Sequence, residues 1–304
     1  MDRYAVGVDL GGTKVEACLV DGRGTIVTRK RIASQPHLGR ARVVENILRV
    51  IVLAAGRRSF EAVGIGTPGT YCPAHDTLYG APHSPTYEQP GLIGELRERL
   101  PVPLQVENDA NCLALGEFFY SCAGRYRSVM AVILGTGVGS GLILDGRLFR
   151  GSQGNAGEIG HVSIDPNGRM CQCGRRGCVE AYLSGPSLSR RFAELTGLML
   201  QPEEIFARCR SGDAAAEGLF AESCQIMAET FANLVNVLDL EAIILGGGVS
   251  NLPVWYEQVG PLLERSLFGI PDRRIPIIKA GLGDSAGVLG AAYLGLRQMG
   301  LMEF

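Results

Sequence analysis

The sequence contains one short pattern twice, at positions 124 residues apart. In each copy an apolar strand pattern runs into a glycine turn, and a second strand pattern ends at an Asp-Gly-Arg hairpin turn. The superposed positions are Leu10 with Leu134, Gly11 with Gly135, and Asp21-Gly22-Arg23 with Asp145-Gly146-Arg147. This spacing is far longer than the period of a solenoid repeat. We therefore expect two similar α/β domains that face each other and hold a nucleotide between their glycine turns.

The order of the expected elements supports this division. Strand patterns lie at residues 4–8, 15–20, 25–31, 62–66 and 102–106, and again at 128–134, 142–144, 241–245 and 275–279. Helical spacing of apolar residues occurs at 41–55, 93–100, 110–119, 187–195, 214–238, 254–266 and 285–299. We place a smaller domain at residues 1–120 and a larger one at 121–304, with the closing helix at 285–300 able to pack back on the first domain.

Composition excludes several classes of protein. The 304 residues are 46% hydrophobic and 20% charged, which is enough for a large core, and the length favours two domains. The formal net charge is −2 and no long run of one sign occurs, so nothing indicates a nucleic-acid or membrane surface. We find neither a signal-peptide pattern nor an apolar segment long enough to span a bilayer, and we expect the protein in the cytoplasm.

The segment Glu107-Asn108-Asp109 lies between an expected strand and an expected helix. The carboxyl ends of strands are where open α/β sheets bind small molecules. We interpret Asp109 as a candidate catalytic base. The alternative is that Asn108 or Asp109 merely caps the helix.

Three glycine-rich turns follow strands and can bind phosphate, because their backbone N–H groups can converge on an anion without obstruction by side chains. Their candidate residues are Asp9, Gly11, Gly12, Thr13 and Lys14; Gly135, Thr136 and Gly137 within the turn 135–141; and Gly246, Gly247 and Gly248. Thr13 and Lys14 add donors, and Asp9 can hold Mg²⁺ through water. None of these turns has the Walker pattern, and the alternative for each is a tight turn without a ligand.

A group of metal-ligand residues lies in the second half of the chain. Cys171, Cys173 and Cys178 fall within eight residues, ten residues after His161. Three thiolates and one imidazole form a closed tetrahedral Zn²⁺ site of the structural kind, and the alternative is reduced, unliganded cysteines. The chain has nine cysteines, an odd number, without a secretory signal, so a disulfide framework is not expected. The other six are interpreted as scattered and mostly small core residues: Cys18, Cys72, Cys112, Cys122, Cys209 and Cys224.

Together these motifs resemble the ROK family of sugar kinases and sugar-responsive repressors, over nearly the full length of the chain. The segment 9–14 resembles the first phosphate motif of the family, 107–111 its catalytic segment and 134–141 its second phosphate motif. The segment Gly154-Asn155-Ala156-Gly157-Glu158-Ile159-Gly160-His161 resembles its sugar and zinc motif, 171–180 its zinc signature and 246–248 its adenosine loop.

The resemblance implies an actin-like, ribonuclease-H-like fold with two α/β domains around a cleft, and a homo-dimer or homo-tetramer. It implies ATP, Mg²⁺ and structural Zn²⁺, with a hexose or N-acetyl-hexosamine phosphorylated on its terminal 6-hydroxyl. It also implies that Asp109 is the base and that Gly69 lies near the sugar. The sugar hydroxyls would be bound by Asn108, Glu158, His161 and Glu180, with His161 bridging sugar and zinc.

The loop at residues 78–87 departs from the family pattern. Many family glucokinases carry an Asn and a Trp there, whereas this loop contains no Asn. The run Thr77-Leu78-Tyr79 and the Cys-Gln-Cys spacing resemble N-acetylglucosamine kinases, and residues 256–269 resemble bacterial fructokinases. We favour N-acetylglucosamine, with fructokinase or glucokinase as alternatives and a catalytically silent sugar sensor as the alternative from another class. A family repressor would carry a helix-turn-helix domain before the first phosphate motif, and here that motif begins at Asp9.

Overall fold

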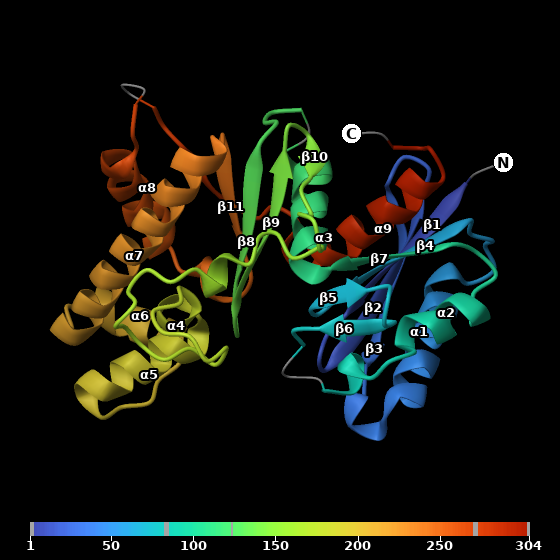
Figure 1. The fold of residues 1–304 in the computed structure, drawn as a ribbon, viewed down its shortest axis with the longest axis horizontal. Coiled ribbons are helices and arrows are strands. Elements are labelled where there is room, and N and C mark those ends of the chain that lie inside the picture. The colour runs from blue at the N-terminus through green and yellow to red at the C-terminus, as the bar shows by residue number, and fades with distance from the viewer. Residues whose placement is uncertain (1–2, 82–84, 123, 270–272, 303–304) are drawn as a thin grey trace. The chain divides into compact units, whose positions relative to one another are not determined.

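The computed structural model describes residues 3–81, 85–122, 124–269 and 273–302, which form two compact units (Figure 1). The first unit comprises the described residues within Met1–Ala123, Arg150–Asn155 and Asp284–Phe304. The second comprises those within Gly124–Phe149 and Ala156–Gly283. The chain therefore passes from one unit to the other four times.

A five-stranded sheet forms the centre of the first unit. Its order is β3 (Ile26–Ala33), β2 (Lys14–Asp21), β1 (Tyr4–Leu10), β4 (Ala62–Thr67) and β7 (Leu104–Asn108). β1 pairs antiparallel with β2, whereas β4 and β7 run parallel to β1. The carboxyl ends of β1, β4 and β7 consequently lie at the same edge of the sheet. A small separate hairpin, β5 (Thr70–Cys72) with β6 (Thr77–Tyr79), follows β4 and was not expected from the sequence.

The two faces of this sheet are covered differently. Val6 and Val8 point into the apolar cluster shared with α1 (Arg40–Ala55) and α2 (Leu92–Arg99). Gly7, which points the opposite way, lets α9 (Ala286–Gln298) approach so closely that a Cβ atom at this position would overlap the Val288 carbonyl oxygen. The alternation of valine and glycine along β1 thus sets one face for side-chain packing and the other for close helix contact.

The second unit repeats this topology. Its sheet has the order β10 (Arg147–Leu148), β9 (Val138–Leu144), β8 (Val129–Leu134), β11 (Ala242–Gly246) and β12 (Ile277–Lys279). β9 is antiparallel to β8, and β11 and β12 are parallel to it, as in the first sheet. The internal repeat seen in the sequence is therefore confirmed as a repeated fold.

One expectation about the second glycine turn is wrong. The turn was expected to span residues 135–141 before a strand at 142–144, but β9 begins at Val138, opposite Leu134. Gly139 and Gly141 are strand residues that pair with Ile133 and Ala131. The side chains of Val138 and Ser140, which alternate with these glycines, are buried, so packing keeps the segment extended despite its glycine content.

The second unit contains the helices α4 (Glu180–Leu183), α5 (Gly185–Thr196), α6 (Pro202–Arg210), α7 (Ala214–Leu238) and α8 (Val254–Ser266), which share one apolar cluster with alternate residues of β8 and β11. Their core is built on large buried side chains that include Trp255, Phe192 and Phe220. In the first unit the helix expected at 110–119 is α3 (Asp109–Gly116), continued by a π-helical turn at Glu117–Ser121. No helix in the described ranges combines the length and apolar character needed to cross a membrane.

Candidate active site

The segment Glu107-Asn108-Asp109 joins the end of β7 to the start of α3. The Oδ1 atom of Asn108 accepts hydrogen bonds from the backbone N–H groups of Ala110 (2.9 Å) and Asn111 (3.3 Å), so Asn108 is the N-cap of α3. The Asp109 carboxylate accepts from the same Ala110 amide at 2.8 Å. It lies in the first turn of α3, where the helix dipole favours negative charge.

Glu107 is the buried centre of this segment. One carboxylate oxygen accepts from the Asn108 backbone N–H (3.0 Å) and from Asn111 Nδ2 (2.9 Å). The other accepts from Arg150 Nε at 2.6 Å, and only 7% of the Glu107 side chain is exposed. Arg150 begins the short stretch 150–155 that belongs to the first unit. The ion pair therefore fixes this stretch to a residue two positions before Asp109.

Gly69, the residue expected near the sugar, lies beside Asn108. Its carbonyl oxygen accepts from Asn108 Nδ2 at 3.3 Å. Gly69 has a positive φ of 75°, and a Cβ atom there would overlap the carbonyl oxygen of Tyr79. Only glycine fits this position without strain. Residues 82–84 of the atypical loop lie outside the described part of the chain.

The first glycine turn connects β1 to β2 at the same sheet edge. The Gly11 N–H donates to the Lys14 carbonyl at 2.9 Å, while Gly12, Thr13 and Lys14 are exposed. Asp9 precedes the turn, and Gly287 of α9 leaves room beside it, since a Cβ atom at that glycine would lie 3.5 Å from the carboxylate. Burial raises the pKa of Asp9 above its ordinary value, and the cation of Lys14 opposes this shift.

In the second unit, two of the expected phosphate loops lie together. Gly135, Thr136 and Gly137 form the β8–β9 turn, and the Gly247 backbone lies against Leu134 so closely that a Cβ atom would overlap its carbonyl oxygen. Gly246 ends β11, and Gly247 and Gly248 are exposed after it. Glu180 adjoins the same turn, because its carboxylate accepts from the Val138 N–H at 3.0 Å.

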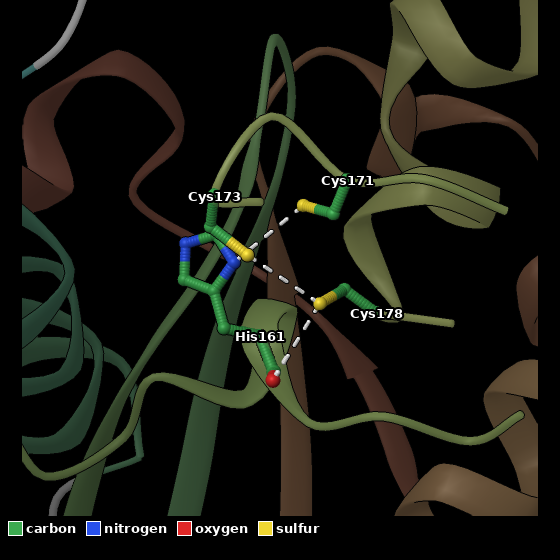
Figure 2. A group of neighbouring side chains, drawn as sticks. All are labelled: His161, Cys171, Cys173 and Cys178. Atoms are coloured by element: carbon green, nitrogen blue, oxygen red, sulfur yellow. Dashed lines mark hydrogen bonds between the residues drawn. The ribbon is translucent and has the colours of Figure 1, made fainter. Parts of the chain in front are cut away.

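The four expected metal ligands also meet in the second unit (Figure 2). Figure 2 shows the three sulfur atoms and the imidazole ring of His161 turned toward one another, and all four possible ligand atoms lie within 4.8 Å of each other. Cys173 Sγ is 3.6 Å from Cys178 Sγ, and Cys171 Sγ is 3.8 Å from His161 Nδ1. Ligands of a tetrahedral zinc ion lie about 3.5–3.8 Å apart, given Zn–S and Zn–N bonds of about 2.3 and 2.0 Å.

The thiol groups of this cluster differ in their ease of ionisation. Desolvation acts to raise the pKa of the Cys173 thiol, but hydrogen bonds from the Arg175 backbone N–H and the other two thiols lower it. Desolvation raises the pKa of Cys178 to about 12. All three cysteines can be thiolates together only if a cation balances their charge. The residues present therefore fit a bound divalent metal.

The loop that carries the cluster is held by short-range pairing. Ser163 bridges with Cys178 and Met170 with Arg176, and Gly177 has a positive φ of 73°. Glu158 lies at the start of this loop. Although part of its side chain is exposed, desolvation raises the pKa of its carboxyl group; His161 opposes this shift and Glu180 adds to it.

The expected site residues thus form two groups, one in each unit. Asp9, the turn 11–14, Gly69, Asn108 and Asp109 belong to the first, and all the others belong to the second. Sequence reasoning missed two contributors, Arg150 and Tyr87. The Tyr87 hydroxyl donates to the Gly11 carbonyl at 2.8 Å. Neither residue forms a local motif with its partner, and each contact joins distant parts of the chain.

Comparisons with known proteins agree with the expected family. The model of the ROK family matches residues 5–298. An N-acetyl-D-glucosamine kinase from Salmonella paratyphi B is 33% identical over 302 residues, covering 95% of this chain and 98% of that protein.

Two solved structures are similar over nearly the whole chain. A ROK family glucokinase from Streptomyces griseus, in complex with glucose and AMPPNP, is 34% identical with a TM-score of 0.79, covering 97% of this chain and 99% of that one. A ROK hexokinase from Thermus thermophilus is 32% identical with a TM-score of 0.90, covering 98% and 99%. The expected fold, an actin-like ATPase fold with two α/β domains, is confirmed.

Proposed function

The chain belongs to the ROK family, and we propose that it is an ATP-dependent sugar kinase acting on the terminal 6-hydroxyl of a hexose or N-acetyl-hexosamine. One observation carries the proposal. Parallel strands β1, β4 and β7 end at the same sheet edge, where they present the glycine turn 11–14, Gly69 and Asp109. An anion-binding turn and a carboxylate base at one edge are the parts that phosphoryl transfer to a hydroxyl requires.

Each residue has a defined role in this proposal. Asp109 orients the sugar hydroxyl and removes its proton, and the Asn108 cap keeps Asp109 at the head of α3. Asn108, Glu158, His161 and Glu180 bind the other sugar hydroxyls, and Gly69 lets the backbone approach the ring. The turns at Gly11 and Gly135 hold the phosphates, and the loop at Gly247 holds the adenosine.

Two metals complete the proposal. Mg²⁺ would neutralise the phosphate charge, and Asp9 would hold it through water. His161, Cys171, Cys173 and Cys178 would hold a structural Zn²⁺, whose closed ligand set leaves no position for reacting water. The role of these four side chains is to order the loop 158–180, so that His161 and Glu180 keep fixed directions toward the sugar.

Among the sugars, we propose N-acetylglucosamine. The relative from Salmonella paratyphi B is named for this sugar, and the loop after Gly69 lacks the Asn that many family glucokinases carry. Glucose and fructose are the alternatives, and the glucokinase from Streptomyces griseus is similar to this chain at nearly the same identity. We also propose a homo-dimer or homo-tetramer, as is usual in the family, which sedimentation would test.

The proposed function is tested by measuring ATP consumption with glucose, fructose, mannose and the N-acetyl-hexosamines. Asp109→Asn keeps the size of the side chain and an oxygen that can accept from the Ala110 N–H, but removes its basicity. General-base assistance is worth about 10²–10⁴ in rate, so turnover should fall by at least that range while calorimetry still detects sugar binding. Near-normal turnover would remove Asp109 from the role, and sugar binding without any turnover in the wild type would indicate a sensor.

A further inference from the structure

Tyr87 connects the segment after Gly69 to the first phosphate turn. It lies in a short 3-10 turn at Pro85–Glu88, and its ring is fully buried in the core of the first unit, in the same cluster as Leu10 and Val15. Its hydroxyl donates to the Gly11 carbonyl oxygen at 2.8 Å. A buried side chain thereby reaches the backbone of a turn whose other residues are exposed.

The turn is anchored on both sides of Gly12. On one side the Gly11 carbonyl accepts from Tyr87, and on the other the Thr13 carbonyl accepts from the Ser34 N–H at 3.1 Å. Ser34 is itself held by Asn46 of α1, whose Nδ2 atom donates to the Ser34 carbonyl at 3.1 Å. Both anchors therefore originate in the core and act on carbonyl oxygens.

The direction of a carbonyl group determines the direction of the next N–H group. A trans peptide is planar, so the Gly11 C=O and the Gly12 N–H point in opposite directions. When Tyr87 draws the Gly11 carbonyl toward the core, the Gly12 N–H must point away from the core, toward the exposed side of the turn. No hydrogen bond within the described residues engages that N–H group.

Tyr87 remains a donor over the whole physiological range. Desolvation raises the pKa of its hydroxyl above the ordinary value. The anchor on Gly11 is therefore independent of pH near neutrality.

We propose that Tyr87 is a positioning residue for ATP: through the Gly11 carbonyl, its hydroxyl holds the Gly12 N–H in the direction that donates to a phosphate oxygen. This inference rests on the proposed function, because it takes the turn 11–14 as the phosphate site. It adds a residue that does not touch ATP and that lies 76 positions from Gly11 in the sequence.

The test compares Tyr87→Phe with Thr86→Val. The first change removes the hydroxyl and keeps the buried ring. The second removes the neighbouring hydroxyl, which makes a bond of the same kind and length, 2.8 Å, to the Pro36 carbonyl instead of the phosphate turn. We expect KM for ATP, and Kd for a non-hydrolysable ATP analogue, to rise about 2- to 10-fold in Tyr87→Phe, the worth of one hydrogen bond. KM for the sugar and all constants of Thr86→Val should stay unchanged.

An unchanged ATP constant in Tyr87→Phe, or an equal rise in both variants, would overturn the proposal. A second measurement needs no variant: the Gly12 amide of the wild type should exchange its hydrogen more slowly once the ATP analogue is bound. Unaltered exchange at Gly12 despite binding would also overturn it. Wild-type protein that binds the analogue but phosphorylates no sugar would refute the proposed function and leave the role of Tyr87 to be decided by these binding data.

Discussion

At the scale of single residues, Asn108 shows that a helix cap can also face the proposed site. Asn108 caps α3 through Oδ1 and reaches Gly69 through Nδ2, so capping does not exclude a place in the site. The cap could be predicted because its partners, Ala110 and Asn111, lie only two and three positions further along the chain. The ion pair of Glu107 with Arg150 spans 43 positions, and no local pattern indicates which arginine a buried carboxylate will meet.

Glu107 should be essential for the position of Asp109. Glu107→Gln removes the charge of the side chain, and its NH₂ group must face one of the three groups that donate to Glu107. Arg150 then loses its ion-pair partner, and the Asn108 backbone is held less firmly. Hydrogen bonds to charged groups are worth about 1.5–3 kcal/mol, and we expect kcat/KM to fall about 10- to 100-fold. Steady-state kinetics would measure this loss. The control is Glu61→Gln, whose exposed ion pair with Arg3 should not affect activity, and a normal rate in Glu107→Gln would contradict the role.

At the scale of elements, the long helices could be predicted, whereas some of the short helices and strands could not. Residues 214–238 were expected as a helix and form α7 with the same bounds. Apolar residues recur at helical spacing over all 25 residues, so a few residues that do not fit the pattern leave the prediction unchanged. α6 was missed because it buries little more than Pro202 and Ile205. The hairpin β5–β6 was missed because strands of three residues are too short to show an alternation of apolar and polar residues.

The loop 158–180 carries the four proposed Zn²⁺ ligands, and we expect its order to depend on them. It buries little apolar surface, so removing one thiolate should release the loop together with its metal. Cys173→Ala is therefore expected to lower both the zinc found by elemental analysis and the turnover. Cys209→Ala, a cysteine of α6 outside the cluster, should change neither. An active protein that purifies without zinc would refute this prediction.

The start of α7 gives a prediction about pH. The Asp213 carboxylate caps the helix by accepting from the N–H groups of Ala215 (3.0 Å) and Ala216 (3.1 Å). The Ala216 bond is the largest cause that lowers the pKa of Asp213. Its stabilisation is present above the unfolded-state pKa, about 3.9, and is lost as pH falls through the folded-state value.

Asp213→Ala should therefore lower the thermal midpoint at pH 7, and the difference from wild type should shrink below about pH 4, near the unfolded-state pKa. Asp213→Asn keeps an acceptor oxygen but lacks the charge, so its thermal midpoint at pH 7 should lie between those of wild type and Asp213→Ala. Thermal melts followed by circular dichroism at a series of pH values would measure this. If the thermal midpoint of Asp213→Ala lay below that of wild type by the same amount at every pH, the charge of Asp213 would have no part in the stabilisation.

At the scale of the whole molecule, a repeated topology is built from sequences that hardly resemble each other. The two sheets share strand order and direction, yet only the glycine turn and the Asp-Gly-Arg hairpin were recognisable in both halves. These turns recur because backbone conformation restricts their residues, whereas strand positions accept many apolar side chains. The sequence could therefore predict the duplication, but not which helices pack closest.

The closest packing in the first unit brings together the two ends of the chain. α9, near the C-terminus, lies against β1, β4 and α3, and a Cβ atom at Gly290 would overlap the backbone carbonyl oxygen of Cys112. Backbone atoms cannot move aside as a flexible side chain can, so Gly290→Ala must separate α9 from α3. Overpacking of this kind costs about 1–3 kcal/mol, and the free energy of unfolding should fall by at least that amount. Because α3 begins at Asp109, its displacement should also lower turnover.

Gly218→Ala provides the matched control for this last prediction. Gly218 also lies within a helix, α7, but it is exposed, and a Cβ atom there would meet nothing within 4 Å. Its change to alanine should raise the free energy of unfolding by about 0.5–1 kcal/mol through helix propensity alone. Urea titrations of both variants measure the two effects with opposite expected signs. If Gly290→Ala were as stable as wild type, close contact between α9 and α3 would not be what holds the end of the chain in the first unit.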